Sequence, residues 1–258
     1  MLFCVLAVTT LSLVPRATLQ PLHGHPQAAP PVLSIAKRGA LPMLSVTSSA
    51  KLFLDEAEMI EATAFPIAPE ELIYKTKSWI VNQNGIDDPD SLADDFEFVG
   101  PVVGPLSKDA YLEAVGGFDI TEAFPDLSPR LYGFRTDPLE PGRVWYISRA
   151  TGTFSGPFAG GAIKPTGKSF EMPPESISVV WNADGKVERF TVGVCMDRGR
   201  GDSGGLGGLF GIMYAVGRPF PFREANPWKK SFRFKLFDLV GSLTQRASRK
   251  QAAAQAEQ

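Results

Sequence analysis

The hydrophobic positions of this chain have a helical spacing in its first half and an alternating spacing in its second half. Within residues 70–82, Leu72, Ile73, Trp79 and Ile80 recur at roughly one or two helical turns. The pair Asn-Gly that follows is typical of the end of a helix. This segment is therefore predicted to be an amphipathic helix with one buried face.

Shorter elements flank this helix. Residues 55–64 are strong helix formers, and prolines separate them from the next element. Residues 89–93 predict a short second helix, and the alternation over residues 96–99 predicts a strand. Ser107 is a suitable N-cap for a helix over residues 108–115. The expected order is helix, helix, strand, helix.

Beyond Pro125 the pattern changes to alternation between turn-rich stretches. Residues 182–185, Asn-Ala-Asp-Gly, are a good hairpin signal. The predicted strands cover residues 130–135, 143–153, 169–172, 176–181 and 186–195. Helices followed by an antiparallel meander predict an α+β fold, with the helices on one face of the sheet.

Several blocks of this core resemble the SnoaL-like polyketide cyclase domains of the nuclear-transport-factor-two-like superfamily. In order, they are LADDFEFVGP, GPLSKDAYLEAV, AFPDL, GTFSGPFAGGAIKPTGKSFEMP and ADGKVERF. The resemblance covers about half of the chain. It implies a cone-shaped fold in which a strongly curved antiparallel sheet packs against the N-terminal helices around an apolar pocket. Such folds serve enzymes and non-enzymes alike, so the site has to decide the function.

The resemblance also implies a carboxylate base in the pocket, opposite a donor that stabilises an enolate. The last strand of the family commonly carries His-Trp and then an acid, whereas this chain has Arg189-Phe190-Thr191-Val192. The candidate catalytic carboxylates that remain are Asp95, Asp126, Glu171 and Asp197. The candidate ligand-binding residues are Tyr111, Trp145, Tyr146, Arg149, Phe158 and Trp181. Each has a structural alternative: Asp95 and Asp126 suit turns, Arg149 can pair with Glu171, and the aromatic residues suit a core.

The N-terminus has the composition of a targeting leader. Residues 2–14 form an apolar run of signal-peptide length, and residues 15–54 are rich in Ala, Pro, Ser and Thr with scattered bases and no acid. This arrangement resembles the two-part leaders of plastid proteins in algae with secondary plastids. A secretory signal with a disordered spacer is the alternative.

The leader also limits the chemistry, because His23 and His25 are the chain's two histidines. Once it is removed, a Ser-His-Asp triad and a histidine-bound metal are excluded. Cys4 would leave with it, so that Cys195, in an apolar run, is expected to be a buried thiol without a chemical role. We expect no metal and no cofactor.

Charge and local motifs exclude further functions. A formal net charge of −2 provides no global field for nucleic acid, and we expect no nucleic-acid partner. Residues 201–205, Gly-Asp-Ser-Gly-Gly, match a protease motif that needs a histidine base. Residues 165–169 imitate the end of a phosphate-binding loop, but no strand-to-helix junction is expected there. Residues 199–211 contain seven glycines, which favour either a lid or collar over the cone's mouth or a tight surface crossing.

The C-terminal segment is basic and amphipathic. Residues 229–250 contain seven bases and one acid, interleaved with large apolar residues. Such a helix could bind an anionic membrane surface or a protein partner, or it could cover the open end of the sheet. The expected organisation is a leader (1–54), a helical linker (55–69), the SnoaL-like domain (70–198), a Gly/Pro-rich extension (199–228), and the basic helix and its tail (229–258).

Two functions follow from these features. The first is binding of a small hydrophobic or amphipathic molecule in the cone, with isomerase- or cyclase-type chemistry by a carboxylate left open. The second is a non-catalytic structural or assembly role, with attachment to a membrane or complex through the sheet and the basic helix. A homodimer is compatible with both.

Overall fold

The computed structural model describes residues 52–116 and 119–256, which form an α+β fold. The predicted fold class is therefore confirmed. The expected leader lies outside the described residues up to residue 51. The helices are α2 (Glu56–Ala62), α3 (Pro69–Val81), α4 (Lys108–Gly116), α5 (Ile120–Ala123), α6 (Gly208–Ala215) and α7 (Phe232–Ala256), with short 3-10 turns η2 (Gln83–Gly85), η3 (Pro89–Ser91) and η4 (Arg223–Ala225).

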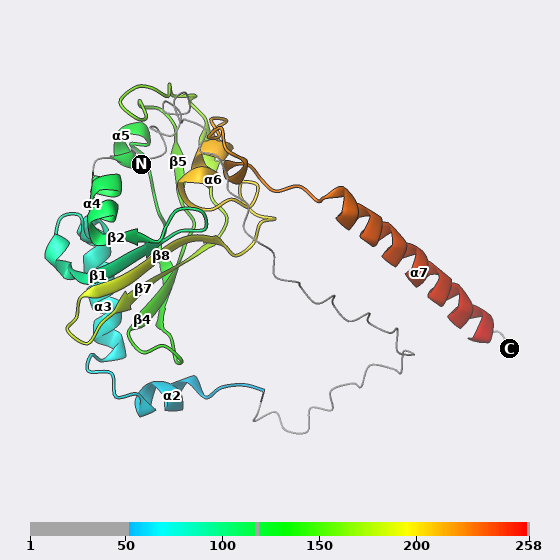
Figure 1. The fold of residues 1–258 in the computed structure, drawn as a ribbon, viewed down its shortest axis with the longest axis horizontal. Coiled ribbons are helices and arrows are strands. Elements are labelled where there is room, and N and C mark those ends of the chain that lie inside the picture. Colours follow the sequence, from blue (N-terminus) through cyan, green and yellow to red (C-terminus); the bar gives the residue numbers. More distant parts are fainter. Residues whose placement is uncertain (1–51, 117–118, 257–258) are drawn as a thin grey trace, which may run out of the picture.

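A large sheet and a small sheet make up the β structure (Figure 1). The strands are β1 (Leu92–Val99), β2 (Leu106–Ser107), β3 (Tyr132–Thr136), β4 (Arg143–Ser148), β5 (Thr151–Thr153), β6 (Ser169–Glu171), β7 (Glu175–Trp181) and β8 (Val187–Cys195). The large sheet has the order β2-β1-β8-β7-β4-β3, and β5 pairs with β6 in the small one. The predicted strand over residues 143–153 is thus two strands, because the chain leaves the large sheet after Ser148.

The pairings in the large sheet are antiparallel, except that β1 lies parallel to β8. The alternation of residues predicts each strand but not this long-range parallel pairing. Register shifts occur between β1 and β8, between β3 and β4, and between β7 and β8. Such irregularities bend and twist strands, which helps the sheet to curve.

Helices α3 and α4 cover one face of the large sheet, α3 over β3 and β4 and α4 over β1 and β2. Pro69 starts α3 at a position where a missing N–H is tolerated, and Leu72, Thr76 and Trp79 form its buried face. The buried residues between these helices and the sheet form what we call the first core: Leu72, Trp79, Leu92, Phe96, Tyr111, Val144, Tyr146, Val179, Trp181, Val187 and Phe190.

A hydrogen-bond chain ties α3 to the sheet inside the first core. The indole N–H of Trp181 on β7 donates to Thr76 Oγ1 at 2.9 Å, and this hydroxyl donates to the Leu72 carbonyl at 2.8 Å. Both side chains are buried. Because a buried N–H without a partner is costly, these two hydrogen bonds specify how α3 packs on the sheet.

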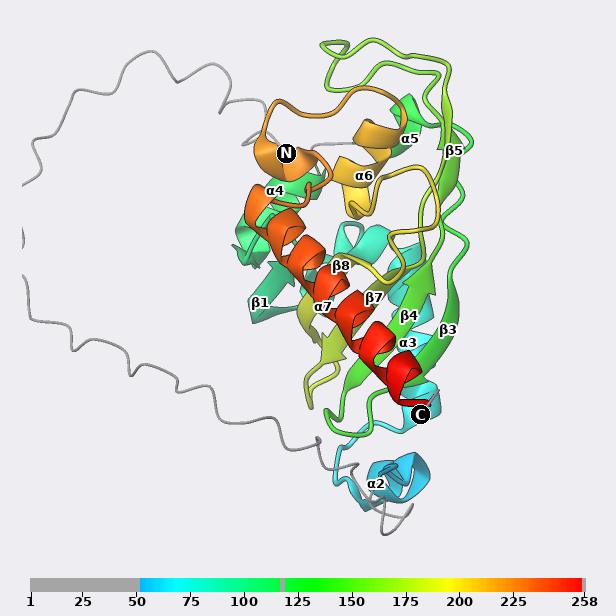
Figure 2. The ribbon, with the colours of Figure 1, turned by 90° about the vertical axis from the view of Figure 1, so that its right-hand side faces the viewer.

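A second core lies beyond one end of the large sheet, among α5, the small sheet, α6 and η4 (Figure 2). Stacked and edge-to-face phenylalanines dominate it, for example Phe124 with Phe154 and with Phe170. Its buried members are Ala123, Phe124, Phe154, Phe158, Phe170, Met172, Ile212, Met213, Val216, Phe220 and Ala225. The segment after β8 therefore packs through α6 and η4 into a second core that it shares with α5 and the small sheet.

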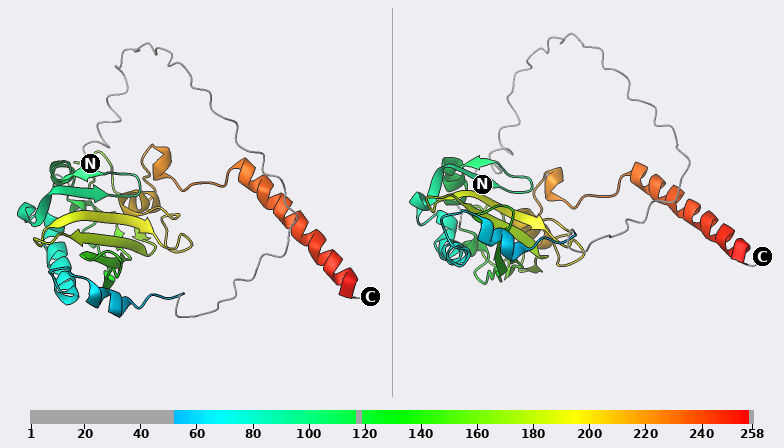
Figure 3. Two further views of the ribbon diagram at one scale, coloured as in Figure 1. Left: turned by 60° about the horizontal axis from the view of Figure 1, so that its bottom comes forward. Right: turned by 90° about the horizontal axis from the view of Figure 1, so that it is seen from below.

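Helix α7 projects away from the two cores (Figures 1 and 3). One expectation for the basic C-terminal helix is that it covers the open end of the sheet. The structure shows α6, and not α7, packed at this end, against β6 and β8. In the described part of the chain, no helix combines the length and the apolar character needed to cross a membrane.

The Thr76–Trp181 bond yields a prediction for stability. Replacing Thr76 with Val keeps the shape of the side chain but leaves the Trp181 N–H unpaired, so the free energy of unfolding should fall by about 1–3 kcal/mol in urea titrations. Trp181→Phe is the matched partner variant. Because it removes the N–H itself, the double variant should lose less than the sum of the two single losses. Strictly additive losses would contradict this role.

Candidate functional site

The four candidate carboxylates lie on the surface of the protein. Asp95 is exposed on β1. The carboxylate of Asp126 accepts the Thr153 N–H at 2.7 Å. The hydrogen bond from Thr153 holds the pKa of this exposed carboxyl below its ordinary value. Asp197 accepts the Gly199 N–H at 2.9 Å and lies 3.8 Å from Arg200. Because these groups are exposed to water, the structure places none of them where a buried base is required.

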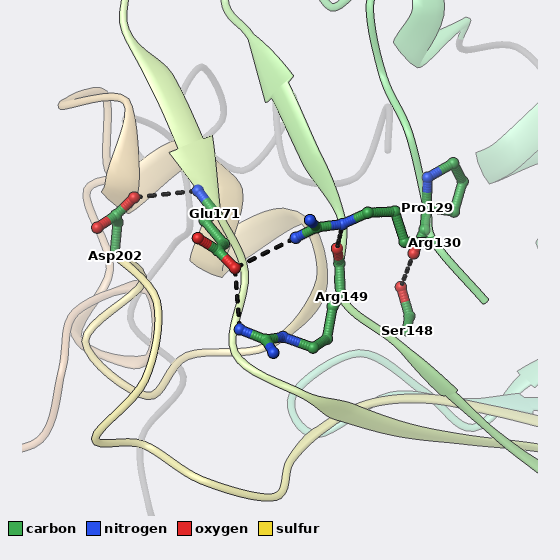
Figure 4. A network of polar contacts seen from close by, with 6 residues as sticks. All are labelled: Pro129, Arg130, Ser148, Arg149, Glu171 and Asp202. Carbon is green, nitrogen blue, oxygen red and sulfur yellow. Dashed lines mark hydrogen bonds and ion pairs between the residues drawn. The ribbon is translucent and has the colours of Figure 1, made fainter. Parts of the chain in front are cut away.

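Glu171 belongs to a surface network on the small sheet (Figure 4). Its carboxylate accepts from Arg149 at 2.9 Å and from Arg130 at 3.2 Å. Its N–H donates to the Asp202 carboxylate at 3.0 Å. The carboxylate is 48% exposed, so each ion pair contributes little to stability. The pairing of Arg149 with Glu171 agrees with the structural alternative for both residues.

The candidate ligand-binding residues do not form one site. Tyr111, Tyr146 and Trp181 belong to the first core, Phe158 belongs to the second, and Arg149 lies in the surface network. The Trp145 N–H donates to Asp137 at 2.7 Å, away from the first core.

Aromatic rings of the protein itself fill the space between the helices and the sheet. The ring of Tyr111 lies 5.1 Å from Phe96, 5.4 Å from Phe98 and 6.3 Å from Phe190. The Tyr111 hydroxyl donates to the Asn84 carbonyl at 3.0 Å, and burial raises its pKa. A tyrosine held in this way is a packing element, so the space around Tyr111 is core and not pocket.

Two open hollows lie on the outside of the molecule. One, of about 1030 Å³, lies between α2 and the turn that connects β3 with β4, next to Leu54, Met59 and Leu139. The other, of about 420 Å³, lies beside Ile163, Lys164 and Arg218. None of the candidate site residues lines either hollow. Among the described residues, no cluster of His, Cys, Asp and Glu could hold a metal ion.

Sequence reasoning missed Glu175, the first residue of β7. This carboxylate is buried, with 6% of the residue exposed. It accepts one hydrogen bond, from the Gly208 N–H at 2.9 Å, and no ion pair is found for it in the described residues. Burial raises the pKa of the Glu175 carboxyl to about 7, and the bond from Gly208 opposes this rise only in part.

The face of the sheet on which Glu175 lies can be read from the strand register. Alternate residues of β7 share a face, so Glu175 follows the line of Ile177, Val179 and Trp181, which contribute to the first core. The predicted strand began one residue later, at Ser176. The signal that could have found Glu175 was this period of two, continued back to the residue after Pro173-Pro174.

Three residues with polar side chains lie next to one another in the strand register at this end of the sheet. Glu175 pairs in register with Ser148, the last residue of β4, and with Cys195, the last residue of β8. Burial and the nearby Glu175 carboxylate are among the causes that raise the pKa of the Cys195 thiol. The thiol therefore stays protonated near neutral pH, and Cys195 is half-buried rather than fully buried as expected. We call Ser148, Glu175 and Cys195 the upper end of the sheet.

The glycine-rich residues 199–211, which we call the collar, cover the upper end. Asp202 donates its N–H to the Glu171 carbonyl at 2.8 Å, and Gly208 donates to Glu175. Gly207 lies directly against the Gly193 carbonyl of β8, where a Cβ atom would overlap with backbone. Close backbone contact explains the glycine at this position. The collar places Glu175 between the first and the second core.

Comparison with known proteins gave similarity to solved structures only: no family model matches the chain, and no curated protein matches it. A protein from Jannaschia sp. CCS1 assigned to the SnoaL-like polyketide cyclases is 16% identical over 61% of this chain and 96% of its own, with a TM-score of 0.42. An NTF2-like protein from Cytophaga hutchinsonii is 12% identical over 48% of this chain and 86% of its own, with a TM-score of 0.30. IdmH from Streptomyces antibioticus, assigned to the polyketide cyclases, is 18% identical over 46% and 89%, with a TM-score of 0.33.

The buried carboxyl of Glu175 makes stability depend on pH. Its folded pKa of about 7 lies above the ordinary value of 4.5, so the folded state binds this proton more tightly than the unfolded state. Stability from this group is fully present below about pH 4.5 and is lost as the pH rises to about 7. The loss should amount to about 3 kcal/mol, from about 1.4 kcal/mol per pKa unit.

The measurement is urea unfolding of the wild type and Glu175→Gln at about pH 5 and about pH 8. Gln is nearly isosteric and uncharged, so the variant should match the wild type more closely at the lower pH and exceed its stability at the higher pH. The control is Glu171→Gln, in the exposed network. Its stability relative to the wild type should not rise between the lower and the higher pH. Parallel pH profiles for wild type and Glu175→Gln would refute the assignment.

Proposed function

We propose that this domain binds a small apolar or amphipathic molecule at the upper end of its sheet and that Glu175 is the acid-base group there. The observation that carries the proposal is a buried carboxylate for which the described residues supply no cation partner. A desolvated carboxylate is a stronger base than one in water, since burial disfavours its charged form. With a pKa of about 7, Glu175 could both take and return a proton near neutral pH.

The surroundings of Glu175 favour apolar ligands over charged ones. The side chains on either side in the sheet, Ser148 and Cys195, carry no charge in their ordinary states, and the two aromatic cores lie below and above. The reaction class that suits one such base is removal of a proton from a carbon beside a carbonyl group, as in isomerases and cyclases. This chemistry agrees with what the SnoaL-like resemblance implies, but it uses a different residue from those expected.

Access to Glu175 requires the collar to move. The bond from the Gly208 N–H occupies the carboxylate, and Gly207 closes against β8. Four collar glycines, Gly201, Gly204, Gly205 and Gly208, have positive φ. Glycine makes the backbone of the collar pliable, so the collar can move off the sheet. An entering ligand would replace the one hydrogen bond from the Gly208 N–H to Glu175.

A Kemp elimination tests for a desolvated, reachable base. The probe is 5-nitrobenzisoxazole, an apolar molecule in which a base removes the single isoxazole C–H proton, the C–H electrons form a nitrile and the N–O bond breaks to give a coloured phenolate. We expect the full chain to accelerate this reaction, with a rate that rises with pH and levels off above about pH 7. Glu175→Gln should lower the accelerated rate at least about a hundredfold.

The matched control is Glu171→Gln, which removes a carboxylate that is exposed and paired with two arginines. It should keep the wild-type rate and pH profile. An equal rate in Glu175→Gln and the wild type would place the base elsewhere. A wild-type rate no higher than that of free carboxylate at the same concentration would show that Glu175 is not reachable. Either result would overturn the proposal.

The collar makes a separate prediction. A methyl group at position 207 would overlap with the Gly193 carbonyl, so Gly207→Ala should push the collar off the upper end. Water would then reach Glu175, and the midpoint of the pH–rate profile should fall from about 7 toward 4.5. The control is Gly241→Ala on α7, where a Cβ atom meets nothing within 4 Å. An unchanged midpoint in Gly207→Ala would mean that the collar does not shield this carboxylate.

A further inference from the structure

Helix α7 carries a row of large apolar side chains that no part of the described chain covers. Phe232, Leu236, Leu239 and Leu243 are 80%, 51%, 55% and 55% exposed. Their spacing of four, three and four residues places them on one side of the helix. A monomeric protein rarely exposes such a row without a partner.

The aromatic side chains gather at the start of α7. Phe234 and Phe237 are exposed but lie outside the row, so the first turns of the helix are apolar around much of their circumference. Trp228, just before the helix, is 73% exposed, and its ring lies 4.7 Å from the Arg198 guanidinium. Trp and Phe beside a basic helix are typical of segments that lie at a membrane surface.

The segment carries a strong net positive charge. Residues 229–250 contain seven bases, and their one acid, Asp238, accepts from Lys230 at 3.2 Å. Arg233, Lys235 and Arg246 are exposed on α7. Long basic side chains next to an apolar row can reach anionic headgroups while their stems lie along apolar groups.

A second copy of the chain fits this helix less well. A coiled-coil seam needs its apolar repeat to continue over three or four heptads. Here the row ends at Leu243, and Arg246 and Lys250 occupy the next positions of the repeat. A two-stranded seam would also leave Phe234 and Phe237 in water, and it would bring like charges together.

We propose that α7 is an in-plane anchor that binds an anionic lipid surface through its apolar row and its basic side chains. Figures 1 and 3 show the helix away from both cores, so it can lie along a surface without displacing α6 or the sheet. The anchor uses no group of the upper end of the sheet and stands independently of the function proposed for Glu175.

The test is co-sedimentation of the full chain with vesicles of phosphatidylcholine alone and of about three parts phosphatidylcholine to one part phosphatidylglycerol. We expect binding to the anionic vesicles to be at least about tenfold tighter, since each cation near such a surface contributes roughly fivefold. The preference should shrink at about 0.5 M salt, where charges are screened within a few ångströms.

Two variants of the full chain separate the apolar and the charged contributions. Leu236→Gln with Leu239→Gln and Leu243→Gln removes most of the row, and Arg233→Gln with Lys235→Gln and Arg246→Gln removes exposed cations. Each triple variant should weaken binding to the anionic vesicles at least tenfold. The matched control, Ser242→Gln with Thr244→Gln, changes polar positions of the same helix and should bind like the wild type. All three keep residues 1–54, so any contribution of the N-terminus cancels.

Sedimentation equilibrium without lipid completes the test. Equal binding of the wild type and both triple variants to anionic vesicles would overturn the anchor. So would a wild-type dimer that the leucine variant alone dissociates while vesicle binding stays unchanged, because α7 would then serve a second copy. The Kemp rate of the charge variant should equal that of the wild type, which keeps failure of the anchor distinct from failure of the Glu175 proposal.

Discussion

One face of strand β7 connects the main parts of the structure. Trp181 at one end of this face donates to Thr76 and seats α3 on the sheet, and Glu175 at the other end accepts from Gly208 and seats the collar. Val179 between them is fully buried. Strand β7 is central in the large sheet, with β4 on one side and β8 on the other. The alternation of residues along β7 therefore decides which of its side chains enter the first core and which lie beneath the collar.

The same residue type has opposite environments at Glu171 and Glu175. Glu171 lies at the end of β6, half exposed to water and between two guanidinium groups. Glu175 lies four residues further on, beyond Pro173-Pro174, where the chain has entered the large sheet. Within the described part of the chain, its carboxylate has one N–H donor, Gly208. The first carboxylate loses little solvation, whereas the second loses most of it, and burial raises the pKa of the Glu175 carboxyl. Position relative to the sheet, not residue type, separates a surface ion pair from a candidate base.

Local patterns in the sequence predict much of the fold and little of the candidate site. The helical spacing at Leu72 and Trp79, the N-cap position Ser107 and the hairpin at Asn182–Gly185 depend on near neighbours, and the structure contains an element at each. The parallel pairing of β1 with β8 depends on contacts far apart in the chain. Whether aromatic rings line a pocket or fill it depends on side-chain packing, which periodicity does not report. Glu175 lies one residue before the predicted start of its strand, so the sequence pattern does not reveal it.

Residues 199–256 form one continuous extension that does two different things. Its first part turns back over the upper end of the sheet and buries Glu175, and its last part leaves both cores as α7. The Arg198–Trp228 contact joins the residue just before the collar to the segment just before α7, so the two ends of this stretch lie close together. The second core holds η4 and most of α6 between these two points, so a packed segment lies between α7 and the first residues of the collar. The two proposals therefore concern opposite ends of one extension: α7 would bind a lipid surface, and the collar would move off Glu175.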